Sequence, residues 1–162
     1  MEIAEKVYNY LDGLGIDYKK HEHPAVRTVE EAQLYWKGID GAQCKNLFLR
    51  DQKGKRHYLV VVEENKKVDM SKLAEQLGEK KLSFASEKRL DKYLKLKPGA
   101  VSPFGLINDE ENLVELKIDK DLKKEKKISF HPNINTVTLE LSYSDFEKYL
   151  KASGNDYEYI AI

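Results

Sequence analysis

The chain has 162 residues, of which 41% are hydrophobic and 35% are charged. This composition is typical of one highly soluble globular domain with a substantial core, and not of a disordered chain. Twenty-eight basic residues balance twenty-eight acidic ones, which excludes a strong overall field toward nucleic acid or membrane and leaves only local patches for such contacts.

Cysteine content and hydropathy indicate where the protein works. The single cysteine, Cys44, excludes an internal disulfide framework and fits a reducing compartment. No apolar run is long enough to span a bilayer, and the sequence after Met1 does not resemble a signal peptide. We therefore expect a cytoplasmic protein without membrane contact.

The first forty residues predict two helices and one short strand. Apolar residues at helical spacing, closed by Gly13 and Gly15, predict the first helix (Ile3, Val7, Leu11 and Leu14). A strand is expected over 16–20. Thr28 and Glu31 have the spacing of a capping box, which predicts a helix through residues 32–36.

The clearest local signal is a hairpin. Residues 45–50 and 56–63 read as strands joined by the polar, glycine-containing turn 51–55. The second strand contains the uninterrupted apolar run Tyr58–Val62. Such a run is typical of a central strand that is covered on both faces.

The chain after the hairpin predicts three more helices and five more strands. The helices are expected after Asp69, after Ser86 and after Ser144, where Ser144 and Glu147 form a second capping box. The strands are expected over 82–84, 113–118, 128–130, 136–141 and 157–162. We therefore predict an α/β (α+β) fold: one domain, residues 1–162, with a mixed, mostly antiparallel sheet flanked by helices.

Three stretches combine turn-forming residues with short polar groups beside apolar runs. In the first, Lys45 and Asn46 are expected where an irregular segment meets a strand, so that a cation and an amide are held rigidly and still reach a ligand. This first stretch is 41–51, and the other two are 99–106 and 130–136. Each stretch alone also fits an ordinary turn, and Lys45 also fits a solvated surface lysine.

Other chemistries have weaker support. Cys44 fits an inert packing residue better than a nucleophile. The chain contains no phosphate loop, no dinucleotide fingerprint and no serine elbow, because Ser102 precedes a proline. The histidines lack the clustered spacing of metal ligands, so we expect no metal and no cofactor (His21, His23, His57 and His131).

Lysine is locally in excess in residues 79–97 and 117–127. Either segment is explained by a solvated face. The alternative is contact with an RNA backbone, whose affinity would fall as salt rises.

Taken together in chain order, four motifs resemble the prolyl-tRNA editing superfamily, which includes the YbaK proteins and the insertion domain of bacterial prolyl-tRNA synthetases. The similarity is greatest to the free-standing PrdX- or ProX-type Ala-tRNA(Pro) deacylases and runs nearly end to end. The motifs are His23-Pro24-Ala25-Val26, Cys44-Lys45-Asn46-Leu47-Phe48-Leu49, Val101-Ser102-Pro103-Phe104-Gly105-Leu106 and Phe130-His131-Pro132-Asn133.

The resemblance implies hydrolysis of the ester that joins a wrong amino acid, usually alanine, to tRNA(Pro). It implies that Lys45 binds the ester end of the substrate, that Asn46 adds a hydrogen bond, and that His131 positions the substrate or transfers a proton. A histidine bonded within a turn remains the alternative for His131. The implied substrate-binding residues are His23, Thr28, Gly99, Ser102, Pro103, Phe104 and Gly105.

In this family the nucleophile is thought to be water, with help from the terminal ribose hydroxyl as one option. The implied partners are the acceptor end of mischarged tRNA(Pro) and, as a further candidate, prolyl-tRNA synthetase. Two alternatives stay open: a Cys-tRNA(Pro) deacylase, as among YbaK proteins, and a noncatalytic module that binds charged tRNA or a synthetase.

Overall fold

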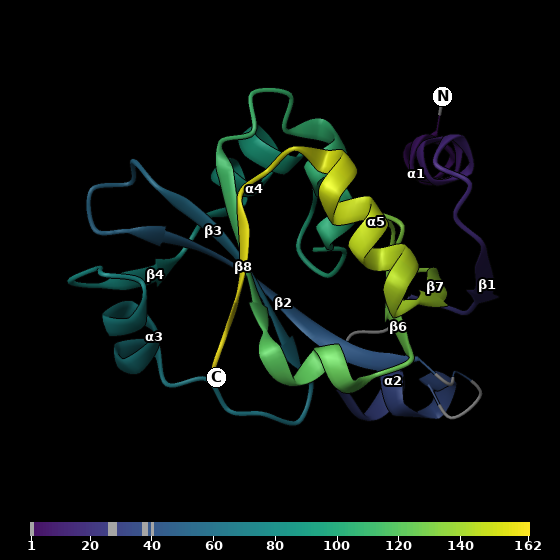
Figure 1. Ribbon diagram of the computed structural model, residues 1–162, viewed down its shortest axis with the longest axis horizontal. Helices are drawn as coiled ribbons and strands as arrows, with labels where there is room; N and C mark the ends of the chain where they lie inside the picture. The colour runs from purple at the N-terminus through teal and green to yellow at the C-terminus, as the bar shows by residue number, and fades with distance from the viewer. Residues whose placement is uncertain (1, 26–28, 37–38, 40) are drawn as a thin grey trace.

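A computed structural model describes residues 2–25, 29–36, 39 and 41–162 (Figure 1). Its helices are α1 (Ile3–Gly13), α2 (Val29–Trp36), α3 (Met70–Gln76), α4 (Glu87–Leu94) and α5 (Tyr143–Ser153), with 3₁₀ helices η1 (Pro103–Asn108) and η2 (Lys120–Lys124). Its strands are β1 (Tyr18–Glu22), β2 (Ala42–Asp51), β3 (His57–Glu63), β4 (Leu82–Phe84), β5 (Val114–Asp119), β6 (Lys127–Phe130), β7 (Val137–Ser142) and β8 (Tyr157–Ile160).

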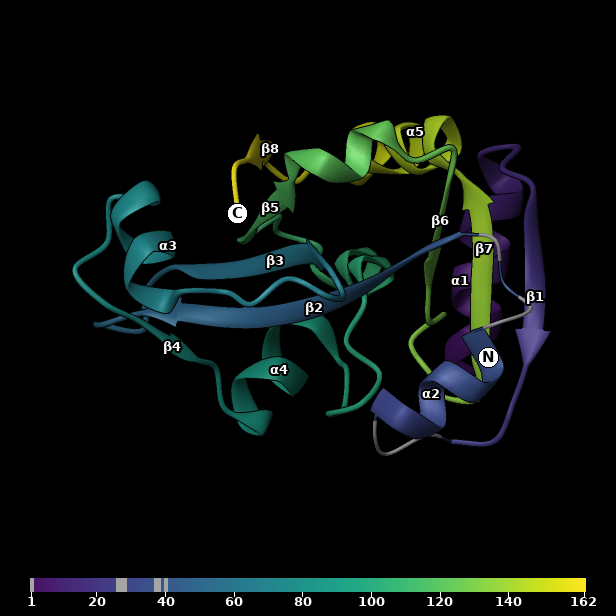
Figure 2. The ribbon, with the colours of Figure 1, turned by 90° about the horizontal axis from the view of Figure 1, so that it is seen from below.

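All eight strands form one sheet in the order β1-β7-β6-β2-β3-β5-β8, with β4 paired to β2. The pairs β2–β6, β3–β5 and β5–β8 are parallel and the other four are antiparallel, which confirms the mixed, mostly antiparallel sheet. The long strand β2 starts beside β6 and continues along β3, so it joins the two halves of the sheet (Figure 2).

The predicted central strand is confirmed. All five residues from Tyr58 to Val62 have no exposed side-chain surface. Alternate residues serve two apolar clusters on opposite faces: Leu59 and Val61 pack in the larger one, and Val60 and Val62 in the smaller one. The larger cluster also contains the apolar face of α1, where Val7 and Leu11 are buried.

Of the four predicted helix caps, Thr28 lies outside the described residues, and two of the other three agree with the sequence. Asp69 accepts hydrogen bonds from the backbone of Ser71 and Lys72, and Ser86 Oγ accepts one from Arg89 N, as predicted. The expected cap at Ser144 is wrong, because Ser142 caps α5 and accepts from Asp145 N at 3.1 Å. Ser142 is the last residue of β7, paired with Lys127, and this long-range pairing sets where the helix begins.

Two strand starts also differ from expectation. β2 begins at Ala42 instead of Lys45, because Ala42 and Gln43 pair with β6, a contact between segments far apart in the sequence. β1 begins at Tyr18 instead of residue 16, where pairing with Leu141 of β7 starts. Local sequence contains neither partner, so local patterns placed both boundaries inaccurately.

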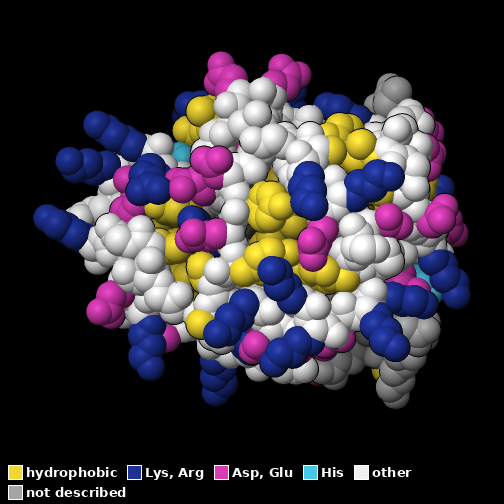
Figure 3. All heavy atoms as spheres, viewed as in Figure 1, with side chains coloured by type: hydrophobic (Ala, Val, Ile, Leu, Met, Phe, Trp, Pro, Cys, Tyr) yellow, Lys and Arg dark blue, Asp and Glu magenta, His cyan; other side chains and the backbone are white. Residues whose placement is uncertain are grey.

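The surface mixes charges of both signs. In Figure 3, lysine and arginine side chains gather over η2, and acidic side chains are interspersed on the same face. No helix in the described part of the chain is long and apolar enough to cross a membrane.

Candidate functional site

Three of the four motifs meet near the point where β2 parts from β6. Gln43 pairs with Ser129 in parallel, whereas from Cys44 onward β2 pairs with β3. β6 ends at Phe130 and leads into His131. Parallel strands that diverge in this way leave a crevice beyond their carboxyl ends, which is a common place for ligands.

A glycine is required at the entrance to β2. A Cβ atom on Gly41 would lie 2.3 Å from Ser129 Oγ and 3.0 Å from the carbonyl carbon of Ile128. Only a residue without a side chain allows β2 to approach β6 this closely. Gly41 therefore sets the position of the strand that holds Lys45 and Asn46.

Lys45 and Asn46 lie inside β2, not at its boundary, and successive strand residues face opposite sides of a sheet. Asn46 pairs with Val61 of the larger cluster, and its Nδ2 donates to Val101 O at 3.2 Å. Lys45 pairs with Val62 of the smaller cluster. Its half-buried side chain has an ammonium group with no hydrogen bond or ion pair to the described residues, so it is available to a ligand.

The second motif forms the start of η1. Ser102 is fully buried and its Oγ accepts from Phe104 N at 3.1 Å, while Pro103 O accepts from the buried Tyr149 hydroxyl at 2.7 Å. Gly99, before this turn, has φ +87, a conformation that favours glycine. The buried Ser102 side chain and the Tyr149 hydroxyl thus fix the loop 99–104 against the core.

Phe104 and Gly105 are packing positions. The Phe104 ring meets Phe130 and Tyr149 edge-on, with ring centroids 5.9 and 5.2 Å apart. A Cβ on Gly105 would lie 2.6 Å from Leu96 Cδ1. The Phe104 side chain and Gly105 face the core, so any contact that these residues make with a substrate has to come from backbone atoms.

In the third motif, His131 makes one hydrogen bond to the described residues, and its second ring nitrogen has no partner among them. Its Nδ1 donates to Val137 O at 2.8 Å, so the turn-bonded arrangement is present at that nitrogen. Burial lowers the pKa of His131 below its ordinary value, and the neighbouring His23 lowers it further, against the opposing effect of the Val137 carbonyl. The neutral ring therefore presents Nε2 as a proton acceptor.

His23 supports His131. Its Nδ1 donates to Pro24 O at 3.0 Å and its Nε2 lies 2.8 Å from Thr138 Oγ1, so both ring nitrogens are occupied. The His23 ring stacks on the Tyr35 ring of α2, and its centroid lies 5.9 Å from the centroid of the His131 ring. Thr28, the other residue expected near this point, lies outside the described residues.

Asn133 is a site residue to which the sequence assigned no role. It is buried, has φ +64, and its Nδ2 donates to Phe104 O at 3.3 Å, so it joins the third motif to the second. An asparagine after a proline in a turn is a known signal for left-handed backbone. Its hydrogen bond to Phe104 depends on the tertiary structure alone.

The alternative chemistries receive no support from the geometry. Burial, followed by the nearby carboxylates of Glu63 and Glu64, raises the pKa of the Cys44 thiol well above its ordinary value, which disfavours the nucleophilic thiolate. Among the described residues, no three His, Cys, Asp or Glu side chains gather as a metal site.

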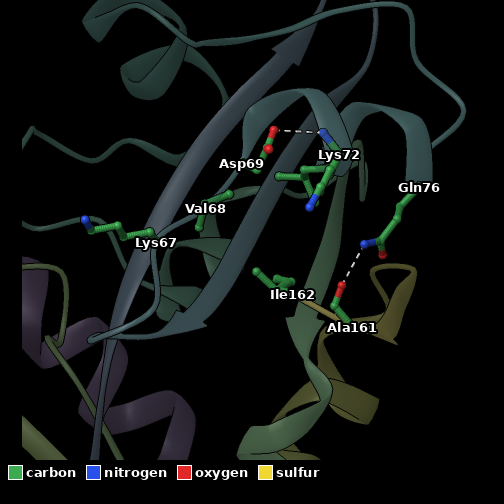
Figure 4. Close-up of a pocket in the computed structure, with 8 residues that line it drawn as sticks. Lys67, Val68, Asp69, Lys72, Gln76, Ala161 and Ile162 are labelled. Atoms are coloured by element: carbon green, nitrogen blue, oxygen red, sulfur yellow. Dashed lines mark hydrogen bonds between the residues drawn. The ribbon is translucent and has the colours of Figure 1, made fainter.

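A separate hollow of about 200 Å³ lies between α3 and the end of the chain (Figure 4). There Gln76 Nε2 donates to Ala161 O at 2.7 Å, which attaches the C-terminal segment to α3. None of the predicted site residues lines it; the lining consists of Lys67, Val68, Asp69, Lys72, Leu73, Gln76, Ala161 and Ile162.

The two lysine-rich segments lie on opposite sides of the sheet. Figure 2 shows α4 on the same side of β2 as α2, and η2 on the other side with α5. α4 packs against η1 and continues through Lys95 and Lys97 into Gly99. Of the two segments, residues 79–97 are therefore the ones that run on into the second motif.

The chain is similar to known proteins along nearly its whole length. Residues 23–149 match the family described as the aminoacyl-tRNA editing domain. The chain is 47% identical to the "Prolyl-tRNA editing protein ProX" of Acetoanaerobium sticklandii, an alignment that covers 100% of this chain and 99% of that protein. It is 34% identical to the mouse "Prolyl-tRNA synthetase associated domain-containing protein 1", over 96% of this chain and 94% of that protein.

A solved structure has the same fold. It is described as a "putative trans-editing enzyme for prolyl tRNA synthetase" and superposes with a TM-score of 0.75 at 20% sequence identity. The match covers 100% of this chain and 98% of that one. At this identity the similarity concerns the arrangement of helices and strands, and it confirms the predicted fold class.

Proposed function

Because the chain belongs to the aminoacyl-tRNA editing domain family, we propose that it is a trans-editing deacylase that hydrolyses the ester of mischarged Ala-tRNA(Pro). The observation that supports this most is the full-length similarity, at 47% identity, to a protein named for prolyl-tRNA editing. The Lys45 ammonium and His131 Nε2, both without a hydrogen-bond partner among the described residues, fit such chemistry.

Such an enzyme has a clear physical purpose. A synthetase pocket that accepts proline discriminates weakly against the smaller alanine, because each missing methylene changes binding by only about 1–3 kcal/mol. A second site that admits small side chains removes the wrong product. The ester is intrinsically labile, so the protein chiefly has to orient it and stabilise the charge that develops on its carbonyl oxygen.

In the proposed reaction, a water molecule attacks the ester carbonyl carbon. His131 Nε2 accepts a proton from the water as the new C–O bond forms. Lys45 stabilises the negative charge on the carbonyl oxygen, and Asn46 adds a hydrogen bond to the aminoacyl group. The bond to the ribose oxygen then breaks, and that oxygen takes up the proton, which releases alanine and intact tRNA.

The other predicted residues shape the site in this proposal. Gly99 and the buried turn at Ser102 and Pro103 present backbone groups to the aminoacyl moiety. Phe104 and Gly105 hold this turn against the core, and His23 holds the ring of His131 in place. Thr28 is proposed as a further substrate contact.

The acceptor end of mischarged tRNA(Pro) is the proposed partner, approaching from the side of α4 and α2. Prolyl-tRNA synthetase is a second proposed partner, and the cytoplasm is the proposed location. We treat residues 1–162 as one editing domain, in line with the nearly complete coverage of the relatives.

Two other functions have specific support. The four motifs also fit Cys-tRNA(Pro) as the substrate, since a cysteine side chain is nearly as small as alanine. The lysines of α4 fit a noncatalytic module that binds charged tRNA. The assays below separate these possibilities.

The decisive experiment measures release of labelled amino acid from Ala-tRNA(Pro), Cys-tRNA(Pro), Pro-tRNA(Pro) and Ala-tRNA(Ala). We expect rapid loss of alanine from tRNA(Pro) alone, and a decrease of about 10²–10³-fold in kcat/KM for Lys45→Ala, because the substitution removes a charge that stabilises the oxyanion. Lys19→Ala, at an exposed strand lysine, should retain full activity.

Circular dichroism and thermal melting should show that both variants fold. A folded wild-type protein that hydrolyses none of these esters but binds charged tRNA would contradict the proposed function and favour the noncatalytic module. Faster release of cysteine than of alanine would assign the alternative substrate.

A further inference from the structure

The site contains buried polar atoms without partners. Folded proteins pair nearly all such atoms, and each unpaired one costs about 1–3 kcal/mol. In the part of the chain that the structure describes, five buried side-chain oxygens have none: Asn46 Oδ1, Glu64 Oε2, Ser129 Oγ, Asn133 Oδ1 and Asn155 Oδ1. Three of these five belong to β2, β6 and the loop after β6, where the candidate site lies.

Two of these atoms belong to asparagines that brace the same turn. Asn46 Nδ2 donates to Val101 O and Asn133 Nδ2 donates to Phe104 O, at the two ends of the segment 101–104. A backbone carbonyl can only accept, so each side chain has to face the turn with its nitrogen. Each amide oxygen is consequently directed away from the carbonyl that its nitrogen binds.

Asn133 is held firmly in this orientation. Its backbone is left-handed, with φ +64, a conformation that asparagine tolerates better than most residues. Only 4% of the residue is exposed, and its amide oxygen has no partner among the described residues. A firmly held, buried acceptor is suited to a donor that a ligand brings.

We infer that the amide oxygens of Asn46 and Asn133 accept hydrogen bonds from the α-ammonium group of the aminoacyl moiety. This subsite rests on the proposed deacylase function and specifies how its substrate is recognised. Hydrogen bonds from a charged donor to buried acceptors are stronger than neutral ones. The half-buried Val101 and Ile134, which pack on the same core, add apolar surface for a small side chain.

The subsite also contributes to discrimination. Alanine has a primary ammonium with three N–H donors, whereas an esterified proline has a secondary ammonium with two and a ring carbon in place of the third. The two N–H donors of proline are enough for the two asparagine oxygens, so the number of donors alone does not separate the two amino acids. Discrimination at this subsite depends on steric exclusion of the ring carbon that replaces the third N–H.

The test compares two esters of tRNA(Pro) that differ only in this group. Alanyl-tRNA(Pro) has the ammonium, and lactyl-tRNA(Pro) has a hydroxyl at the same carbon beside the same methyl group. Each rate is divided by the uncatalysed rate of that ester, because the two differ in intrinsic lability. We expect the wild-type kcat/KM to favour the alanyl ester by about 10- to 100-fold after this correction.

Asn133→Gly removes the amide and keeps a residue that accepts positive φ. We expect its preference for the alanyl ester to fall to within about threefold of unity, chiefly through loss on that ester. Asn112→Gly is the matched control, because Asn112 also has positive φ, at +55, but is exposed and away from the site. It should keep the wild-type preference.

Asn133→Asp retains an acceptor oxygen, and we expect it to keep a preference for the ammonium even if Asn133→Gly fails to fold. Equal losses on both esters in Asn133→Gly would overturn the inference and make Asn133 a purely structural brace. A wild-type protein that hydrolyses both esters equally would also overturn it, with the deacylase function intact. Hydrolysis of neither ester would instead refute the proposed function.

Discussion

The hairpin between β2 and β3 and the loops beside β6 are both polar turns, yet they use their polar atoms differently. In the hairpin, Asp51 Oδ1 accepts from the backbone of Lys55 and Arg56, and the Arg89 guanidinium donates to Gly54 O and His57 Nε2. Beside β6, the side-chain oxygens of Asn46, Ser129 and Asn133 are buried and have no partner in the described part of the chain.

This difference separates a structural turn from a binding site. A turn whose donors and acceptors are paired internally contributes to stability and offers little to a ligand. Loops that are held by some of their polar atoms while others stay unpaired are rigid and still receptive. His57 and His131 show the same contrast, since Arg89 donates to Nε2 of His57, whereas Nε2 of His131 has no partner among the residues that the structure describes.

The largest effect is expected for His131→Asn. The asparagine amide can still donate to Val137 O, so the loop should keep its stability, but the proton acceptor is lost. We expect kcat/KM for Ala-tRNA(Pro) to fall by about 10²–10⁴-fold. In the wild type, activity should decline on the acid side through a pKa below the ordinary 6.5 of histidine, because His131 must be neutral to accept a proton.

A pH–rate profile of both proteins checks this prediction. The acid limb should be absent in His131→Asn. An unchanged limb and a rate within threefold of the wild type would mean that His131 only supports the turn.

The intermediate effect concerns His57 and acts on stability alone. Burial, followed by the charge of Arg89, lowers the pKa of His57 to about 4. Between that value and 6.5, the unfolded chain binds a proton that the folded chain does not, so stability falls as the pH falls through this window. We expect a loss of about 1–3 kcal/mol from this residue.

Urea unfolding at several pH values compares the wild type with His57→Gln, which keeps an acceptor for Arg89 and does not titrate. The variant should lose less stability between pH 6.5 and 4 and should retain its deacylase activity at neutral pH. Parallel curves for the two proteins would contradict the assignment.

The smallest effect is expected for Tyr149→Phe, which removes the hydroxyl that donates to Pro103 O. The carbonyl is left buried and unpaired, which should cost about 1–2 kcal/mol of unfolding free energy. Activity should fall less than tenfold, since the two asparagines still hold the turn. Tyr143→Phe, which loses a hydroxyl contact to Tyr159, is the matched control and should leave activity unchanged.

The sequence by itself determined the features that depend on local pattern. The apolar run Tyr58–Val62 predicted a central strand, and Asp69 and Ser86 predicted the starts of their helices. The motifs around Lys45, Ser102 and His131 indicated the family. Periodicity, caps and short motifs are properties of neighbouring residues, so they can be recognised from the sequence without a structure.

Only the tertiary structure decided what depends on partners far away in the chain. Because Ala42 pairs with β6, β2 starts three residues earlier than predicted. Lys45 and Asn46 therefore lie within the strand, on its opposite faces. The bonds from Asn46 and Asn133 to one turn, and the oxygens that they leave unpaired, exist because three distant segments meet there. Long-range backbone pairing and burial set these features, and no local pattern encodes them.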